Sequence, residues 1–132
     1  MTEGDLGALL RKLSVTTRPG AWCMVSGVVL PADVEVQATI VEREGTTSVI
    51  SCRDASRLGI TPEFVMAWLT LDVNSALDAV GLTAAVATAL ARHGLACNVL
   101  AGFHHDHLLV SFDEQDRAIE VLRSLAKGAA SS

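Results

Sequence analysis

The chain has 132 residues, half of them hydrophobic, and a formal net charge of −5 from 15 acidic and 10 basic residues. This length allows one ordinary domain or two very small ones, and the hydrophobic content excludes a disordered chain. The sequence has no cluster of basic residues, Arg11-Lys12 being the only adjacent pair, so the composition argues against nucleic-acid binding.

The cysteines and the N-terminus bear on location. Cys23, Cys52 and Cys97 lie in apolar runs without a CxxC motif, which predicts buried free thiols in the cytoplasm. A catalytic Cys–His pair is the alternative, but the sequence places no histidine beside a particular cysteine. The acidic N-terminus and the short apolar runs predict neither a signal peptide nor a membrane span.

The first half begins with a helical pattern and continues with strands. Four leucines at helical spacing predict a short helix that ends before residues 16–20: Leu6, Leu9, Leu10 and Leu13. Apolar runs and period-two alternation then predict strands at 21–29, 34–40 and 47–52, the last two forming a hairpin. Residues 54–59 predict one helical turn that ends at Gly59.

The second half carries the clearest pattern of the chain. Residues 64–73 predict a strong strand, and Trp68 within it is interpreted as a core residue. A helix follows Gly81 and ends at Gly94. Two strands at 97–101 and 107–112 flank a polar tip, and a final helix at 113–127 precedes a frayed tail. The two halves therefore predict αβββα followed by βαββα, an α+β fold.

A family resemblance rests on the second half. The motifs that carry it are Leu77 to Ala91, Gly94, Cys97-Asn98-Val99, Ala101-Gly102 and His105 to Leu108. Over residues 64–126 the chain resembles small stand-alone bacterial ACT-domain proteins, and the resemblance is looser over residues 1–63. It implies two ferredoxin-like βαββαβ units with antiparallel sheets and helices on one face: an N-terminal ACT-like domain at 1–63 and an ACT domain at 64–132.

The second unit departs from this pattern because the chain ends without a fourth strand after the last helix. We hypothesise that a strand of the first half, at 21–29, fills the vacancy.

The resemblance also implies a function. Such domains bind a small effector, commonly an amino acid, at an interface between units, so we expect a non-enzymatic regulatory homodimer without a cofactor or a membrane partner. The residues to which it assigns the ligand are Asn74, Ser75, Asp78, Val80, Gly81, Leu82, Thr83, Asn98 and Val99.

Each of these features has a structural alternative. Gly81 can simply make the turn, with Asp78 or Thr83 capping the helix. Asn98 interrupts an apolar strand, and its buried amide is expected to bond either neighbouring backbone or a ligand. The whole chain can also be a structural or protein-interaction module without a ligand site.

The polar tip at His104-His105-Asp106-His107 offers imidazole and carboxylate groups that could ligate zinc or nickel. Strand alternation, however, points His105 and His107 to one face and the other two residues to the opposite face. We therefore interpret the tip as a solvated hairpin turn and assign no metal ligand; a metal protein built on this cluster is the remaining alternative.

Overall fold

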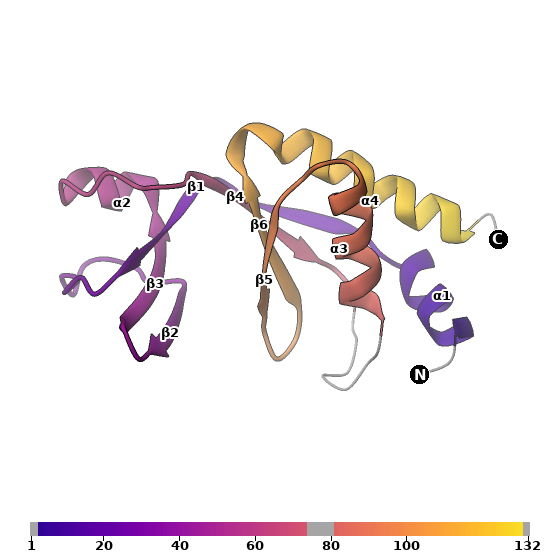
Figure 1. Cartoon of the computed structure of the whole chain (residues 1–132), viewed down its shortest axis with the longest axis horizontal. Coiled ribbons are helices and arrows are strands. Elements are labelled where there is room, and N and C mark those ends of the chain that lie inside the picture. Colours follow the sequence, from indigo (N-terminus) through magenta and orange to yellow (C-terminus); the bar gives the residue numbers. More distant parts are fainter. Residues whose placement is uncertain (1–2, 74–80, 131–132) are drawn as a thin grey trace.

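A computed structural model of the chain describes residues 3–73 and 81–130. Figure 1 shows the order of the elements along the chain. The helices are α1 (Glu3–Arg11), α2 (Cys52–Arg57), α3 (Leu82–Arg92) and α4 (Gln115–Ala130), with a 3-10 turn, η1, at Phe112–Glu114. The strands are β1 (Val15–Ser26), β2 (Ala38–Glu42), β3 (Gly45–Ser51), β4 (Met66–Leu71), β5 (Cys97–Ala101) and β6 (Asp106–Ser111).

The strands of the described residues form one antiparallel, six-stranded sheet in the order β2-β3-β1-β4-β6-β5. The long strand β1 has two sets of partners. Its first part pairs with β4, from Val15 opposite Leu71 to Arg18 opposite Trp68. Its second part pairs with β3, from Trp22 opposite Ser51 onward. A register shift between Arg18 and Trp22 separates the two parts.

This order contains two overlapping ferredoxin-like sheets, β2-β3-β1-β4 and β1-β4-β6-β5, which share the central pair β1–β4. A strand of the first half therefore fills the vacancy beside β4, as hypothesised. The pairing residues are 15–18 and Trp22 rather than the whole of 21–29, because most of that segment pairs with β3. The predicted α+β class, with ferredoxin-like antiparallel units, is confirmed.

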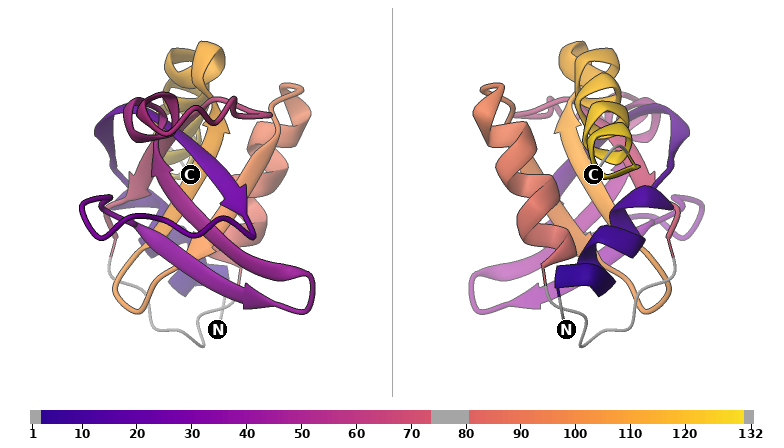
Figure 2. Two further views of the ribbon diagram at one scale, coloured as in Figure 1. Left: turned by 90° about the vertical axis from the view of Figure 1, so that its left-hand side faces the viewer. Right: turned by 90° about the vertical axis from the view of Figure 1, so that its right-hand side faces the viewer.

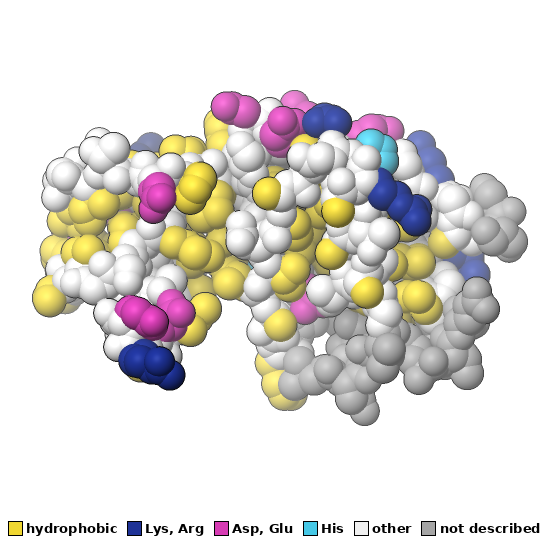
Figure 3. All heavy atoms as spheres, viewed as in Figure 1, with side chains coloured by type: hydrophobic (Ala, Val, Ile, Leu, Met, Phe, Trp, Pro, Cys, Tyr) yellow, Lys and Arg dark blue, Asp and Glu magenta, His cyan; other side chains and the backbone are white. Residues whose placement is uncertain are grey.

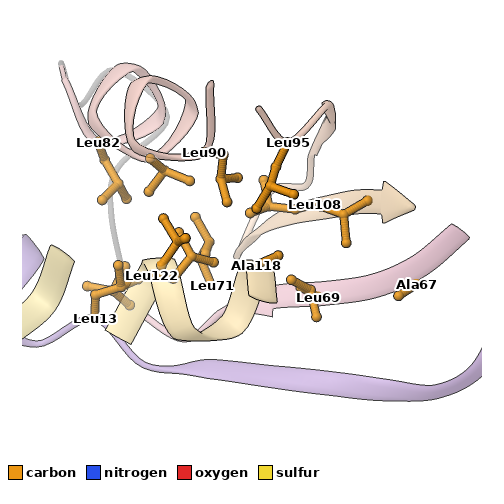
Figure 4. Packing of buried hydrophobic residues seen from close by; sticks show 14 residues of the cluster. Leu13, Ala67, Leu69, Leu71, Leu82, Leu90, Leu95, Leu108, Ala118 and Leu122 are labelled. Atoms are coloured by element: carbon orange, nitrogen blue, oxygen red, sulfur yellow. The ribbon is translucent and has the colours of Figure 1, made fainter. Parts of the chain in front are cut away.

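All four described helices cover the same face of the sheet, but they form two groups at opposite ends of that face. Figure 1 shows α2 at one end and α1, α3 and α4 at the other, and the right-hand view of Figure 2 shows these three helices in front of the strands. The inward faces of α3 and α4 pack against β4 and β6 to form the main core, which Figure 4 shows from nearby. Leu69, Leu90, Leu108 and Leu122 are fully buried there or nearly so. At the other end, Cys23 and Ile50 pack against Ala55 of α2.

The opposite face of the sheet carries no helix among the described residues, yet its centre is buried. Trp22, Val49, Met66, Trp68 and Leu109 form a separate cluster there. The exposed fraction of Trp68 is 2% and that of Leu109 is 0%, although the hydrophobic residues of this cluster all come from strands. The twisted sheet therefore curls over this face, which we call the concave face, so that the β2–β3 and β5–β6 wings enclose the cluster.

Three boundaries predicted from sequence are wrong. Residues 16–20 belong to β1, because the register shift accommodates Pro19, which lacks a backbone donor. The hairpin's first strand begins at Ala38, so residues 34–37 lie outside it, with Val34 buried beside α2 instead. The last helix continues through Ala130, so residues 128–130 are helical rather than a frayed tail.

Of the helices described, none is long and apolar enough to cross a membrane.

Candidate functional site

The start of α3 has the geometry of an anion-binding helix N-terminus. Gly81 is the N-cap residue, with a left-handed backbone at φ 103°, and no side chain of the described residues bonds the cap. The first turn of α3 contains no acidic residue. Because the first N–H groups of a helix lack partners within it, they present partial positive charge to an anion.

Gly81 lies next to the Leu6 side chain of α1. A Cβ atom placed on Gly81 would lie 3.0 Å from Cδ2 of Leu6. Leu6 itself packs against the main core, so the N-terminal helix fixes the position at which α3 begins. The left-handed backbone of Gly81 agrees with a glycine turn, but Thr83 does not cap the helix and Asp78 lies outside the described residues.

The next two residues of α3 differ in burial: Leu82 is buried and Thr83 is exposed. Leu82 is a core residue with an exposed fraction of 3%, so only its backbone is available to a ligand. Thr83 is exposed, and its Oγ1 donates a hydrogen bond of 3.4 Å to Oδ2 of Asp106. That bond connects the start of α3 to the hairpin between β5 and β6. The predicted ligand residues Asn74, Ser75, Asp78 and Val80 lie outside the described residues.

Asn98 and Val99 point to opposite faces of β5. Val99 packs against the main core on the helix side, whereas Asn98 lies on the concave face. The prediction of a buried Asn98 amide is wrong: β5 is at the edge of the sheet and Asn98 is exposed. The structure therefore does not bring the Asn98 side chain to the side of the sheet on which α3 begins.

Asn98 instead lines a groove of about 760 Å³ between the two wings of the sheet. This volume lies within the range of about 300–1,000 Å³ that small-molecule sites occupy. Hydrophobic side chains gather between the wings on the side shown in Figure 3. The lining combines β1 and β3 with the starts of β4 and β5 and the end of β6, and includes Met24, Thr47, Phe64, Met66 and Ser111. Sequence reasoning missed the groove because its lining comes from five separated segments.

The histidines of the tip lie in different environments: His104 is in the turn and His107 is in β6. The Gly102 N–H donates a 2.9 Å hydrogen bond to the His105 carbonyl and closes the turn, with His104 exposed in it. The interpretation as a solvated turn is wrong for His107, which lies in β6 and contacts the Trp68 ring. Within residues 3–73 and 81–130, no three His, Cys, Asp or Glu side chains gather closely enough to hold a metal ion.

The three cysteines are free thiols. Cys23 is buried as predicted, whereas Cys52 and Cys97 are partly buried. Burial raises the pKa of Cys23 to about 11, with the neighbouring Cys52 thiol adding to the shift. Burial also raises the pKa of Cys97. A raised pKa disfavours the nucleophilic thiolate, so none of these features marks a catalytic cysteine.

Comparison with known proteins relates the chain to one family. Two family models described as ACT domain match residues 63–124 and 1–67. A crystal structure from Vibrio cholerae, titled a protein of unknown function and possible transport protein, is 35% identical over 93% of this chain and 97% of that one, with a TM-score of 0.82.

Two more distant structures share the fold. A protein from Agrobacterium tumefaciens is 18% identical, with coverage of 86% and 89% and a TM-score of 0.61. The regulatory subunit of aspartate kinase from Thermus thermophilus is 9% identical, with coverage of 84% and 95% and a TM-score of 0.62. The search of curated proteins found no match to the sequence.

Proposed function

The chain belongs to the ACT-domain family, and we propose that it is a non-enzymatic regulatory module that binds an amino acid or a similar small metabolite. The observation that carries this proposal is the uncapped start of α3 at Gly81. The family resemblance assigns the effector to this loop and helix start. A helix N-terminus without an acidic first turn favours the carboxylate that every amino acid carries.

The proposed site consists of the loop at 74–81, the first turn of α3 and the backbone of β5. Asn74, Ser75 and Asp78 supply polar groups to the amino acid's ammonium or side chain, while the N–H groups of Val80 to Thr83 hold its carboxylate. Asn98 and Val99 contribute through their β5 backbone, since their side chains lie on opposite faces. The Thr83–Asp106 bond joins the helix start to the adjacent hairpin, so a ligand at the helix start would contact a restrained surface.

The proposal includes a cytoplasmic homodimer. β5 is an edge strand, and its outer backbone groups have no strand partner among the described residues. Pairing of β5 with β5 of a second copy would satisfy the outer groups that the effector does not bond and would form the interface between units that the proposal requires. We assign two units, residues 1–63 and 64–132, each of which completes its sheet with a strand from the other. The free thiols favour the reducing cytoplasm.

Isothermal titration of the chain against the twenty amino acids tests the proposal. We expect measurable heat for one amino acid or a few related ones. The substitution Thr83→Glu places a carboxylate at the helix start and is expected to weaken binding by about tenfold or more, since like charges repel. Thr88→Glu is the matched control, because Thr88 is also exposed on α3 but lies nearer its other end.

Flat heats for all twenty amino acids would reject the amino-acid proposal, and equal weakening by both substitutions would reject the site. Flat heats together with a protein that co-purifies in fixed ratio would instead favour the structural or interaction module. That alternative has its own support in the exposed edge of β5 and in Phe64 and Phe112, which are 69% and 42% exposed.

A further inference from the structure

Arg18 lies on the concave face, and its positive charge has no ion-pair partner among the described residues. It is the cross-strand partner of Trp68, and its guanidinium carbon lies 4.0 Å from the centre of the Trp68 ring. The ion pairs among the described residues involve Arg57 and Arg117, and none involves Arg18. Asp72, which follows β4, accepts a hydrogen bond from Thr16 and forms no ion pair with Arg18.

The guanidinium retains unused donors. Nη1 of Arg18 donates a 2.7 Å hydrogen bond to Oε1 of Gln37, and this is the one hydrogen bond of its side chain within the described residues. An arginine side chain carries five N–H donors in a plane. Stacking on Trp68 covers a face of that plane and leaves its edge, which is the part that binds a carboxylate through two parallel hydrogen bonds.

Trp22, whose ring lies beside both Trp68 and Arg18, carries a second unsatisfied donor. Its ring lies 5.7 Å from the Trp68 ring at 66°, and the Arg18 guanidinium carbon lies 5.9 Å from it. Trp22 is 9% exposed, and its buried Nε1 has no hydrogen-bond partner among the described residues. Buried polar groups are normally satisfied, so the unpartnered indole N–H of Trp22, on a ring that adjoins the guanidinium, calls for an acceptor.

His107 fixes the third ring of the cluster without supplying negative charge. The Trp68 Nε1–H donates to Nδ1 of His107 over 3.2 Å, and the Thr70 hydroxyl lies 3.0 Å from the same atom. An indole N–H can only donate, so Nδ1 is the acceptor and the neutral ring carries its proton on Nε2. The neutral imidazole thus orients Trp68, on whose ring Arg18 packs, and itself supplies no counter-charge to the guanidinium.

We propose that Arg18, held on Trp68, and the N–H of Trp22 bind the carboxylate of a small anionic ligand on the concave face. A carboxylate supplies both features that the cluster lacks, a negative charge and planar acceptors. The net charge of −5 argues against a polyanion as the ligand. This site is separate from the start of α3, which lies on the helix-covered side of the sheet.

Intrinsic fluorescence reports on this site directly, because Trp22 and Trp68 are the two tryptophans of the chain and it has no tyrosine. The folded chain is titrated with sodium acetate, sodium succinate and sodium benzoate up to about 50 mM, with sodium chloride keeping the ionic strength constant. We expect a saturable change in emission for at least one carboxylate.

Arg18→Gln is expected to abolish this change, and Arg18→Lys to weaken binding by about tenfold, because an ammonium cannot make the planar double contact. Arg123→Gln, an exposed arginine of α4, is the matched control and is expected to bind as the unmodified chain does. Circular dichroism establishes that each variant is folded; should Arg18→Gln fail to fold, Arg18→Lys serves as the test.

A response no larger than that of chloride for all three carboxylates would overturn the proposal. So would an equal response in the Arg18 variants. A saturable response to sodium phosphate without one to any carboxylate would overturn the assignment of the ligand class. These outcomes are distinguishable from failure of the amino-acid site, which the paired Thr83 and Thr88 substitutions test independently.

Discussion

The indole N–H of Trp68 points at Nδ1 of His107, 3.2 Å away on the neighbouring strand. The bond requires an unprotonated Nδ1, and burial lowers the pKa of His107, with Arg18 and His105 adding to the shift and Asp106 opposing it. In the unfolded chain the pKa returns to about 6.5. The histidine therefore stays neutral in the fold at pH values where the unfolded chain has already bound a proton.

The first prediction is that stability falls as the solution is acidified. Above about pH 6.5 both states are neutral at His107, and its contribution is fully present. As the pH falls from about 6.5 to the lowered pKa of the folded state, the unfolded chain binds a proton at His107 that the folded chain does not bind, and the contribution is lost. Urea midpoints at about pH 7.5, 6.5 and 5.5 measure this loss.

The matched variants for this prediction are His107→Gln and His104→Gln. A glutamine oxygen can accept the Trp68 hydrogen bond without titrating, so His107→Gln is expected to flatten the pH dependence between these values. His104 is exposed in the hairpin turn, and its substitution is expected to leave the slope unchanged. Equal slopes in all three proteins would show that another group controls the pH dependence.

Gly81 and Gly128 give a prediction of opposite sign for the same chemical change. Gly81→Ala forces a Cβ into a left-handed backbone at φ 103° and toward Leu6, so we expect a loss of about 1–2 kcal/mol. Gly128 is helical, and a Cβ there would meet nothing within 4 Å. Gly128→Ala is expected to gain about 0.5–1 kcal/mol from helix propensity. Urea denaturation measures both; a stable Gly81→Ala protein would refute the assigned backbone strain.

Cys23 is predicted to be unreactive in the folded protein. With a pKa of about 11, its thiolate fraction at pH 8 is about 0.1%, and its side chain is fully buried. Labelling of the Cys23 thiol with Ellman's reagent is expected to be slow until urea unfolds the chain. A Cys23→Ser variant is the control: its native rate should match the original, and its denatured thiol count should fall by one. Fast native labelling that Cys23→Ser removes would contradict the buried position.

Leu122→Ala is predicted to be among the costly core substitutions. Leu122 is fully buried in the cluster of Figure 4, between α4 and the sheet. Removing its side chain leaves a cavity, and the expected loss is about 2–5 kcal/mol. Leu125, one turn away and partly buried, serves for comparison and is expected to lose less as alanine. The urea midpoints of the two variants measure these losses. Small and equal losses in both would indicate that α4 is loosely attached to the sheet.

Local patterns predicted most of the helices and strands. β5 was predicted at 97–101 with its observed bounds, because Gly94 ends the preceding helix and the apolar run is short. The order of helices and strands in both halves is also as predicted. These features depend on residues close together in the chain, where propensity and periodicity act directly.

Features that depend on strand order could not be predicted in this way. The exposure of Asn98 does not follow from the sequence, because an apolar run does not reveal that its strand lies at the edge of the sheet. The adjacent Pro19-Gly20 predicts a break in the chain, so the sequence gives no sign that Arg18 lies in a strand. Its stacking partner, Trp68, is 50 positions further along and becomes a neighbour only through the pairing of β1 with β4.

The shared pair β1–β4 has a consequence for the order in which the protein can be made. Val15 pairs with Leu71 and Arg18 pairs with Trp68. The first part of β1 therefore cannot pair with β4 while the ribosome is still adding the intervening residues. The β2–β3 hairpin can form earlier, but neither four-stranded sheet is complete until β4 has emerged. The N-terminal segment is therefore synthesised first and docked late, and a nascent chain halted near residue 63 would expose Trp22 and the unpaired side of β1.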